Sequence, residues 1–394
     1  MINVGIDIAK FKHVFSIYDT SNGQVIEEGI AFSNDLDGFM KLLSHIKDYS
    51  KAKLLIGMED TGHYHLVLFK FLLDKGYKVA FINPLTTNFE RKANGDYSKN
   101  DHIDSLTICD ILSSGERKKK YRISDYTSFE SYEIKQLTRH HHDLKEELNV
   151  YKNRLQKSID IIFPEFNSLF KNKYGAVYMN ILRKCPSAYE IADTDIRTLD
   201  KLFKLKGKGR RIDLDAKTLK EAAKRSIGIY SICEIIKVRN LVAQIELIEK
   251  QIEEIDKKIE EHSMNVDSPI LSIPGISHFS GTSILAEIGN IDNFNSAAKI
   301  IKFAGVSPSG YESGTFSAKH SAITKKGSKY LRKTLYQIIL PVIRVNPTFN
   351  RYFNLKLSQG KSFRCAQGHC IRKLLRVIFH LLKTNQRFDP LLLQ

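Results

Sequence analysis

The sequence predicts a chain of mixed class, with an α/β domain first and two mainly helical regions after it. Three observations support this prediction. Residues 1–122 alternate short β-like runs with helical ones. A basic segment, GERKKKYR at residues 115–122, separates them from long helical stretches. The chain has 394 residues, 42% hydrophobic and 10% aromatic, so it is large and apolar enough to build more than one folded core.

The first predicted elements are three strands. Residues 1–9, MINVGIDIA, alternate apolar and polar side chains, which is the period of a strand. The apolar face of this strand carries Ile2, Val4, Ile6 and Ile8. HVFSIYD at residues 13–19 and QVIEEGIAF at residues 24–32 follow after short turns. Short turns between consecutive strands indicate an antiparallel meander.

Two further strand and helix units complete the first region. A helical segment at residues 36–48 leads to AKLLIGM, residues 52–58, a continuous apolar strand. HLVLFKFLLDKG, residues 65–76, is predicted as a helix that ends at glycine, and YKVAFINP, residues 77–84, as a strand that ends at proline. With one more helix the order becomes βββαβαβα. This is the order of an RNase H-like layered α/β fold, which we expect over residues 1–122.

A mainly helical region is predicted for residues 123–263. FPEF at residues 163–166 and the basic KGKGRR at residues 206–211 interrupt it. KGKGRR lacks the strand and helix that a nucleotide-binding loop needs, so we interpret it as a basic loop. Apolar residues then recur at spacings of three and four: Val238, Leu241, Ile245, Ile248, Ile252, Ile255 and Ile259. This heptad pattern predicts either a helical hairpin within the chain or a coiled coil between subunits.

The third region, residues 264–394, is predicted to be helical. SIPGISHFSGTSILAEIGNI, residues 272–291, has a Pro-Gly turn between two helical runs. This is the form of a helix-hairpin-helix, whose backbone amides can hold a DNA phosphate without reading bases. A basic stretch at residues 319–333 and an amphipathic helix at residues 371–383 follow. The polar face of that helix is either solvated or turned towards phosphate groups.

The charge balance predicts a polyanionic partner. The chain has 61 Lys and Arg against 44 Asp and Glu, which gives a net charge of +17 and a pI near 9.4. Nucleic acid is the first candidate and an acidic membrane surface the second. Because the sequence has neither an apolar run of about 18 residues nor a secretory signal pattern, we expect a cytoplasmic protein without a membrane span.

Cysteine and histidine residues give no metal-binding pattern. The five cysteines are scattered and form no C-x-x-C pair, so buried thiols are the preferred interpretation even where Cys365 and Cys370 flank His369. In HHH at residues 140–142, consecutive helical side chains point about 100° apart and cannot share an ion, which favours a solvated helix.

Carboxylates at the ends of predicted strands carry the main signal for chemistry. A protein that only binds nucleic acid has no need of acidic residues there, because they would repel the partner. Asp7 lies on the polar side of the first strand, and Glu59 ends the fourth. KNDHID places Asp101 and Asp104 three residues apart at the start of a helix. In a layered fold these ends converge, which would gather four carboxylates.

Such a cluster would need divalent cations, because neighbouring carboxylates raise one another's pKa. Oxygen ligands select Mg²⁺ or Mn²⁺, and two such ions about 4 Å apart suit phosphoryl transfer. The alternative is that each residue is an ordinary strand-end or helix-start residue. The four together, on an RNase H-like order, favour the metal site. Its nearby competitors are Asp60, Asp96 and Asp110.

Two serines raise a separate question. Ser313 and Ser317 lie in YESGTFSAKH, residues 311–320. Local spacing places no obvious base beside either one. The residues themselves therefore do not distinguish a nucleophile from a polar turn.

The chain resembles a known family, the DEDD-type transposases of insertion sequences, which are related to the pilin-gene invertase. Ordered motifs in both end regions carry the resemblance, whereas the stretch at residues 160–230 matches poorly. The N-terminal motifs are GIDIAK, MEDTGHY, INP and KNDHIDSL. The C-terminal motifs are SIPGIS, AEIG, FAGVSPSGYESG, ITKKGSKYLRKTL, RKLL and FDP. The resemblance implies a RuvC-like domain of RNase H type at the N-terminus and a transposase domain at the C-terminus.

The resemblance implies DNA strand exchange through a serine. The family's acidic tetrad falls on Asp7, Glu59, Asp101 and Asp104, and its nucleophile falls on Ser313. Ser313 would attack a phosphodiester and form a covalent phosphoserine link, while the tetrad binds Mg²⁺, or Mn²⁺, beside it. Such a link keeps the energy of the phosphodiester for religation.

The resemblance also implies partners. They are donor and target DNA, together with a bridge-type non-coding RNA that pairs with both, so base pairing would supply the sequence specificity. A homo-oligomer, a dimer or tetramer, would combine the RuvC-like domain of one subunit with the serine-bearing domain of another. The net charge of +17 would serve both RNA and DNA backbones. The expected location is the cytoplasm of a bacterial or archaeal cell, at the nucleoid.

Two other functions remain as alternatives to this RNA-guided recombinase. A RuvC-like metal-dependent nuclease or junction resolvase would use the same carboxylates with water, and would not need Ser313. A non-catalytic nucleic-acid scaffold would use the helix-hairpin-helix for binding and the coiled coil for assembly.

Overall fold

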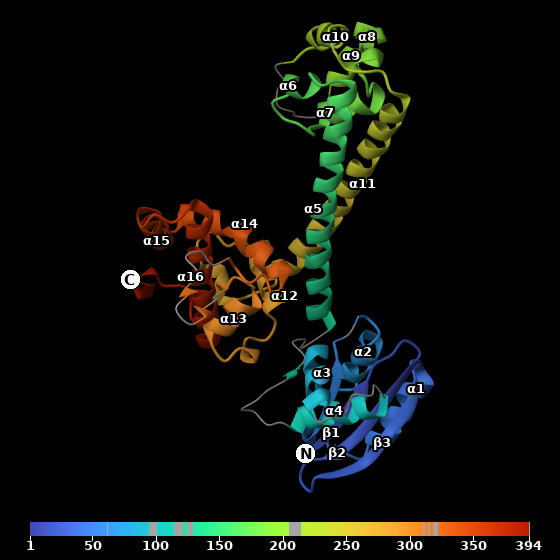
Figure 1. The fold of residues 1–394 in the computed structure, drawn as a ribbon, viewed down its shortest axis with the longest axis vertical. Helices are drawn as coiled ribbons and strands as arrows, with labels where there is room; N and C mark the ends of the chain where they lie inside the picture. The colour runs from blue at the N-terminus through green and yellow to red at the C-terminus, as the bar shows by residue number, and fades with distance from the viewer. Residues whose placement is uncertain are drawn as a thin grey trace. The chain divides into compact units, whose positions relative to one another are not determined.

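A computed structural model gives the fold of the chain (Figure 1). It describes residues 1–60, 62–93, 101–113, 121–123, 129–204, 214–309, 312–313, 316–317 and 322–393. The chain divides into two compact units, one formed by Met1–Lys135 with Asp267–Gln394 and the other by Gln136–Val266. No helix in the described ranges is both long and apolar enough to cross a membrane.

A six-stranded sheet forms the N-terminal region, with the strand order β3-β2-β1-β4-β5-β6. The strands are β1 Ile2–Asp7, β2 Lys12–Asp19, β3 Gln24–Ser33, β4 Leu54–Glu59, β5 Val79–Ile82 and β6 Tyr121–Ile123. β1, β2 and β3 pair as an antiparallel meander, whereas β1, β4 and β5 run parallel. The predicted meander and parallel units are therefore confirmed. β6, which adds an antiparallel edge to β5, lies where the sequence indicated a linker.

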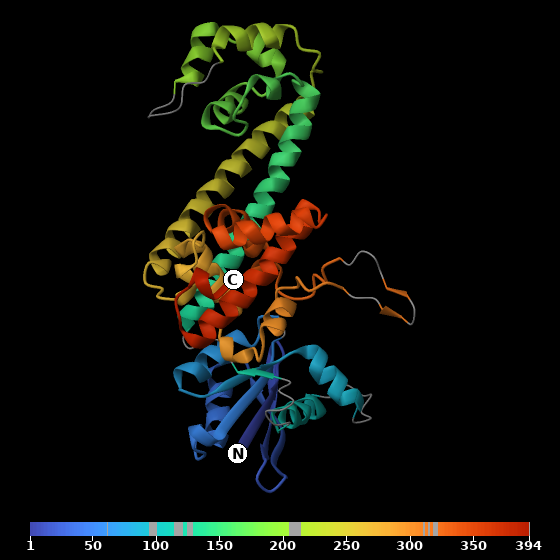
Figure 2. The ribbon, with the colours of Figure 1, turned by 90° about the vertical axis from the view of Figure 1, so that its left-hand side faces the viewer.

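Helices cover both faces of this sheet (Figures 1 and 2). They are α1 Leu36–Ile46, α2 Leu66–Asp74, α3 Pro84–Ala93 and α4 Asp101–Ser113, with a short 3₁₀ turn, η1, at Lys51–Lys53. Val4 and Ile6 share a core with α1 and α2. Leu55 and Ile82 pack with Ile108 of α4 in a separate core. Because neighbouring strand residues face opposite ways, these two cores define the two faces of the sheet.

The second unit is built on two long helices, α5 Phe129–Ile162 and α11 Ile232–Ser263, which lie side by side (Figures 1 and 2). An ion pair from Lys152 to Glu249 at 2.9 Å joins them, and His141 Nε2 lies 3.0 Å from Asp256 Oδ1. All seven residues of the predicted heptad pattern are buried. The pattern thus serves helix packing within the chain, and a coiled coil between subunits stays a prediction.

In the residues that the structure describes between α5 and α11, five short helices connect the far ends of these two helices. They are α6 Phe166–Leu169, α7 Ala176–Lys184, α8 Ala188–Asp193, α9 Ile196–Phe203 and α10 Ala216–Lys224. An aromatic cluster of Phe166, Phe170 and Tyr178 holds the start of this segment together. The predicted basic loop KGKGRR falls outside the described residues.

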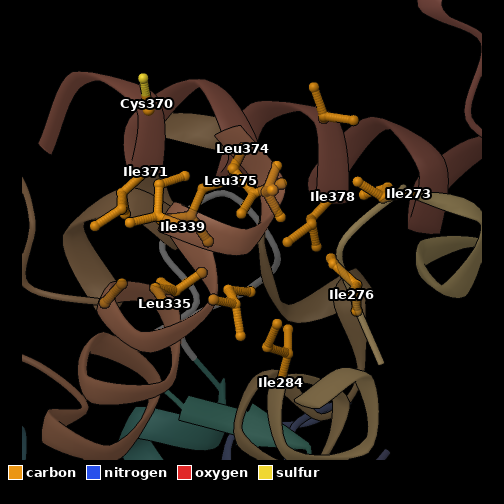
Figure 3. Close-up of a cluster of buried hydrophobic side chains, with 14 of the residues drawn as sticks. Ile273, Ile276, Ile284, Leu335, Ile339, Cys370, Ile371, Leu374, Leu375 and Ile378 are labelled. Atoms are coloured by element: carbon orange, nitrogen blue, oxygen red, sulfur yellow. The ribbon is translucent and has the colours of Figure 1, made fainter. Parts of the chain in front are cut away.

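Helices also form the C-terminal region. They are η3 Pro269–Ser272, α12 His278–Ile288, η4 Ile291–Asn293, α13 Ala297–Phe303, α14 Lys329–Val345, α15 Pro347–Ser358, α16 Phe363–Thr384 and η5 Pro390–Leu393. One apolar core joins them, and Figure 3 shows Leu374 and Ile378 of α16 among residues of α12 and α14 such as Ile284 and Ile339. Two short strands, β7 Glu312–Ser313 and β8 Phe316–Ser317, complete the region.

The predicted helix-hairpin-helix takes a different form. The Pro-Gly turn lies between a 3₁₀ turn, η3, and one α-helix, α12, rather than between two α-helices. Gly275 has a φ of 95°, and a Cβ atom there would lie 2.7 Å from the Cα atom of Val342 on α14. The turn is therefore shaped for close packing on α14, and phosphate binding by it stays a prediction.

Candidate active site

The carboxyl ends of β1 and β4 place Asp7 and Glu59 side by side. Ile6 of β1 is the register partner of Met58 in β4, so the next residues on the two parallel strands are Asp7 and Glu59. Neighbouring strands lie about 4.8 Å apart. Both side chains are partly exposed. The two carboxylates predicted from the strand ends therefore come from adjacent positions at one edge of the sheet.

Two glycines determine which face these carboxylates share. A Cβ atom on Gly5 would lie 2.2 Å from the carbonyl oxygen of Ser105, and one on Gly57 would lie 2.8 Å from a methyl group of Leu112. Both glycines thus face α4. Because side chains alternate along a strand, Asp7 and Glu59, each two residues further on, are on the α4 face as well.

The direction of α4 brings its acidic first turn to the same end. Asn3, near the start of β1, donates a hydrogen bond to Ser113 Oγ at 2.9 Å, at the end of the helix. Ser105, near the helix start, lies over Gly5. α4 is therefore antiparallel to β1, and its first turn with Asp101 and Asp104 lies towards the carboxyl end of β1. Asp101 is exposed and Asp104 is buried.

A buried cysteine of α4, Cys109, packs against β1. Cys109 Sγ lies 3.1 Å from the amide nitrogen of Gly5, which donates to it. Burial raises the pKa of the Cys109 thiol to about 12, so the group is a neutral thiol at physiological pH. This agrees with the prediction of buried thiols for Cys109 and also for Cys370, whereas Cys365 is exposed.

Arg91 of α3 holds Asp104. Its Nη1 atom donates to both carboxylate oxygens of Asp104, at 3.1 and 3.5 Å, and its Nη2 atom donates to Asn88 Oδ1 at 3.3 Å. The Arg91 side chain is 16% exposed and that of Asp104 is 8% exposed. The guanidinium therefore compensates a buried negative charge at the edge where the sequence predicts metal ligands.

The four predicted carboxylates fit a hard divalent cation in chemistry, because all their donor atoms are oxygen. Asp7 and Glu59 are on the α4 face of the sheet, and Asp101 and Asp104 are in the first turn of α4 itself. In the described part of the chain, however, no three His, Cys, Asp or Glu side chains are close enough together to hold a metal ion. This conformation thus brings the carboxylates to one edge without closing them into a ligand set.

The competing acidic residues have other surroundings. Asp60 lies 3.7 Å from Nε2 of the buried His65. Asp110 is on the exposed side of α4. Asp96 lies outside the described residues. The assignment of the four carboxylates rather than these competitors stays a prediction.

The histidine run does not form a solvated face as predicted. His140 is exposed, but His141 and His142 are buried. Nε2 of His141 lies 3.0 Å from Oδ1 of Asp256 on α11. The run serves the packing of α5 in the second unit, since α5 buries part of this turn against its partner helix.

The described residues around the two serines, 307–309, 312–313, 316–317 and 322–324, pair in antiparallel fashion and are called the arm below. At its base, Ser309 N donates to Ala322 O at 2.7 Å and Thr324 N donates to Ser307 O at 2.9 Å. Further out, Ser313 pairs with Phe316 and Glu312 pairs with Ser317. Among the described pairs, Ser313 with Phe316 is therefore one pair further from the base than Glu312 with Ser317.

Three residues that the sequence analysis did not identify, Arg332, Ser328 and Glu287, form hydrogen bonds near the base of the arm. Arg332 Nη1 donates to the carbonyl oxygens of Ala304 and Lys325, both at 3.2 Å. Ser328 Oγ, at the start of α14, lies 2.6 Å from the buried carboxylate of Glu287 on α12. Glu287 lies in the motif AEIG and Ser328 in ITKKGSKYLRKTL, so each motif contributes one partner of this contact. An acidic residue on a mostly apolar helix was the available signal for Glu287.

Comparison with known proteins gives two family matches. A family of transposases of the DEDD type, represented by IS110, matches residues 4–164. The transposase family of IS116, IS110 and IS902 matches residues 267–354. The first match spans the sheet, its carboxylates and α5, and the second spans the arm with Ser313 and most of the C-terminal helices.

Two relatives match almost the whole chain, and a third matches about a third of it. The pilin gene-inverting protein of Moraxella bovis is 22% identical over 395 residues, which cover 98% of this chain and 97% of that protein. The mini-circle putative transposase for IS117 of Streptomyces coelicolor is 23% identical over 408 residues, which cover 98% and 94%. An uncharacterized 42 kDa protein of insertion element IS900 from Mycobacterium paratuberculosis is 30% identical over 125 residues, which cover 31% of this chain.

Proposed function

The chain belongs to the DEDD-type transposases of the IS110 family, and from this premise we propose that it exchanges DNA strands through a phosphoserine intermediate, guided by RNA. Transposition and DNA recombination are the activities of the family. The finer proposal assigns Asp7, Glu59, Asp101 and Asp104 to metal binding and Ser313 to nucleophilic attack.

The arrangement of the carboxylates is the observation that carries this proposal. Asp7 and Glu59 are neighbours at the end of two parallel strands, and α4 is antiparallel to β1, so Asp101 and Asp104 lie towards that end. Bound Mg²⁺ or Mn²⁺ would stabilise the charge that develops on the attacking and leaving oxygens of a phosphodiester. The chain's contribution is to supply oxygen ligands from two rigid strands and one rigid helix, with Gly5 and Gly57 setting the helix close to the sheet.

In this proposal Arg91 pairs with Asp104 until a cation takes its place, and then binds a DNA phosphate. A cation that takes Asp104 as a ligand must compete with the guanidinium at 3.1 Å. Once displaced, the guanidinium would lie beside the site with its donors available, and a DNA phosphate is a suitable bidentate acceptor for it. Without a bound cation, the ion pair compensates the buried carboxylate of Asp104.

The proposed covalent step conserves the number of phosphoester bonds. As the bond from Ser313 Oγ to phosphorus forms, the bond from phosphorus to one deoxyribose oxygen breaks. The serine proton leaves to a base, and the released deoxyribose oxygen takes up a proton. The reverse reaction with a different DNA end joins new strands, and no external energy source is needed.

We propose Ser313 rather than Ser317 as the nucleophile. Among the described pairs, Ser313 with Phe316 is one pair further than Glu312 with Ser317 from the hydrogen-bonded base at residues 307–309 and 322–324. Gly314 follows Ser313, and a residue without a side chain permits close approach of a DNA backbone. The family likeness, through FAGVSPSGYESG, points to the same serine.

Partners follow from charge and family. We propose donor and target DNA as substrates and a bridge-type non-coding RNA as the guide, because a net charge of +17 suits several nucleic-acid backbones at once. A dimer or tetramer with composite sites would bring the carboxylates of one subunit to the serine of another. We place the reaction in the cytoplasm, where the chromosomal DNA is.

A recombination assay in cells tests the role of the carboxylates. The probe is a plasmid that carries the gene with its flanking non-coding DNA and a second plasmid with a target site, and the readout is the junction between them. We expect Asp7→Asn and Glu59→Gln each to lower junction formation at least about a hundredfold. Asp110→Asn, on the exposed side of α4, is the matched control and should retain activity.

RNA binding by the same purified variants separates the site from the fold. Asp101→Ala and Asp104→Ala should abolish junctions while binding the flanking transcript as the unchanged protein does. Loss of transcript binding in a folded variant would count against the metal-site role. Junctions that persist without Asp7 or Glu59 would exclude it. Cleavage without strand joining would favour the nuclease, and transcript binding without any cleavage would favour the scaffold.

A further inference from the structure

A cavity of about 450 Å³ lies in the C-terminal region, away in sequence from the carboxylates and from Ser313. It is bounded by α15, by the second half of α16 and by the segment that follows α16. Cavities of this size accommodate a small molecule or a single nucleotide. All residues that line it are among the described ones.

The floor and side walls of the cavity are apolar and aromatic. Val377 and Leu381 of α16 are buried and form the floor. Tyr352 of α15 and Phe388 after α16 contribute rings, and both also pack on the apolar core that Figure 3 shows in part. Both rings therefore contact the core and also line the cavity.

The rim of the cavity is cationic. Lys373 and Arg376 come from one turn of α16, and Arg387 comes from the following segment. The one carboxylate on the rim, Asp389, accepts a hydrogen bond from Leu391 N at 2.8 Å. The rim therefore has an excess of positive charge, and its carboxylate is already used to cap the short η5 turn.

Lys373 is the most enclosed of these cations. Its ammonium nitrogen lies 4.8 Å from the ring centre of Tyr352, and that of Lys356 lies 5.2 Å from the same ring. Burial, and to a lesser extent the positive charge of Arg351, lowers the pKa of Lys373. An anion bound at this corner would offset the mutual repulsion of these cations.

The wall after α16 is fixed in place. Phe388 N donates to Ser272 Oγ at 2.8 Å, and Lys383 pairs with Asp292 at 2.7 Å. Asn385, with a φ of 54°, ends α16 and turns the chain back. The contact to η3 thus holds the segment that carries Arg387 and Phe388, and the contact to η4 holds the end of α16, so the cavity is part of the folded domain.

We propose that this cavity binds one unpaired nucleotide of a single-stranded nucleic acid, with the base against Phe388 and the phosphate beside Lys373 and Arg376. Aromatic surfaces next to Lys and Arg are the means by which proteins hold single strands, since bases stack on rings and phosphates bind cations. An acidic peptide could pair with the cations of the rim, but its carboxylates would not stack on the aromatic rings of the walls. The inference goes beyond strand exchange, because it concerns strand binding and needs no cleavage.

Direct binding measurements test the proposal. The probes are a labelled 12-nucleotide RNA and a DNA of the same sequence, each titrated with the full chain carrying Ser313→Ala so that cleavage plays no part. We expect Phe388→Leu, which keeps an apolar contact with the core, and Arg376→Ala, which alters an exposed side chain, each to weaken binding of at least one strand about tenfold. Selective loss for RNA or for DNA identifies the strand.

A charge-matched control excludes a general electrostatic effect. Arg364→Ala removes an exposed cation from the same helix, about 18 Å from Arg376 along the helix axis, and should change binding less than twofold. Equal losses for Arg364→Ala and Arg376→Ala, or unchanged binding in Phe388→Leu, would overturn the proposal.

Photocrosslinking gives a readout that does not depend on affinity. Strands with 5-iodouracil in place of uracil or thymine should crosslink to Phe388 or Tyr352. Crosslinks confined to other regions of the chain would overturn the assignment. Because neither measurement requires DNA cleavage, failure here leaves the proposed strand exchange untouched, and failure of strand exchange leaves this site untouched.

Discussion

Nη1 of Arg91 on α3 lies 3.1 Å from Oδ1 of Asp104 on α4, and both side chains are largely buried. This pair joins the two helices at the edge of the sheet where Asp7 and Glu59 end their strands. A buried carboxylate needs a compensating positive charge, which either the guanidinium or a metal ion can provide. If Asp104 is a metal ligand as proposed, its pairing with Arg91 would link the stability of the domain to metal binding.

Replacing Arg91 should lower stability and raise metal affinity together. In Arg91→Ala the buried carboxylate loses its cation, so we expect the free energy of unfolding without metal to fall by about 3 kcal/mol. Added Mg²⁺ should then raise the unfolding midpoint more than in the unchanged protein, and at lower concentration. Thermal unfolding across a Mg²⁺ series measures both effects. Lys92→Ala, at the exposed neighbouring position, is the control, and an identical Mg²⁺ response in all three proteins would show that Arg91 does not compete with the ion.

Gly5 should be intolerant of any side chain. A Cβ atom there would lie 2.2 Å from the backbone oxygen of Ser105, and backbone cannot move aside as a flexible side chain can. Gly5→Ala should therefore push α4 off the sheet, lower the free energy of unfolding by about 2 kcal/mol and abolish recombination. Gly368→Ala is the matched control, because the nearest atom to a Cβ there is the Tyr336 hydroxyl at 3.8 Å. Similar behaviour of the two variants in thermal unfolding would refute the close seating of α4.

Ser328 should contribute more to the free energy of unfolding than an ordinary helix cap does. Its Oγ accepts from Leu331 N at 3.0 Å and also lies 2.6 Å from the buried carboxylate of Glu287. Loss of a cap costs about 1 kcal/mol, and Ser328→Ala should exceed this because it also removes a partner of a buried charge. Ser362→Ala, at the exposed cap of α16, should cost only the cap. Chemical denaturation of both variants gives the comparison, and equal losses would contradict the account.

The stability of the first domain should fall in mild acid because of His13. Burial lowers the pKa of His13 below its ordinary value of 6.5. A histidine with a lowered folded-state pKa is neutral in the fold and charged in the unfolded chain, so its contribution is present above pH 6.5 and is lost as the pH falls below that value. We expect a loss of up to about 1.4 kcal/mol per pH unit there. His13→Asn, whose oxygen can accept from Ala9 N as Nδ1 of His13 does, should flatten this dependence in unfolding curves from pH 7.5 to 5. An unchanged slope would assign the effect to other groups.

Much of the first domain could be predicted from the sequence, because strand alternation and helix signals are local properties. The meander, the apolar strand before Glu59 and the helix that begins at Asp101 are confirmed in the structure. β6 was not predicted, since three residues next to a basic run have no period of their own. The helix-hairpin-helix prediction was wrong in form, because the packing of Gly275 on α14 is invisible in a local pattern.

The candidate site could be predicted in part. The four carboxylates follow from their positions at element ends, but the pairing of Asp104 with Arg91 depends on how α3 packs on α4. His141 and His142 were interpreted as solvated because the second long helix that covers them lies about a hundred residues away in sequence. The choice of Ser313 over Ser317 depends on family likeness alone and stays a prediction.

The measurement that tests the central claim most directly is a search for a covalent protein–DNA adduct. The protein is expressed with its flanking transcript and donor and target DNA, the reaction is stopped with denaturant, and the modified residue is identified by mass spectrometry after nuclease digestion. We predict a phosphodiester link on Ser313, absent in Ser313→Ala and present in Ser317→Ala. Strand exchange that proceeds in Ser313→Ala, or an adduct on a different residue, would contradict the account.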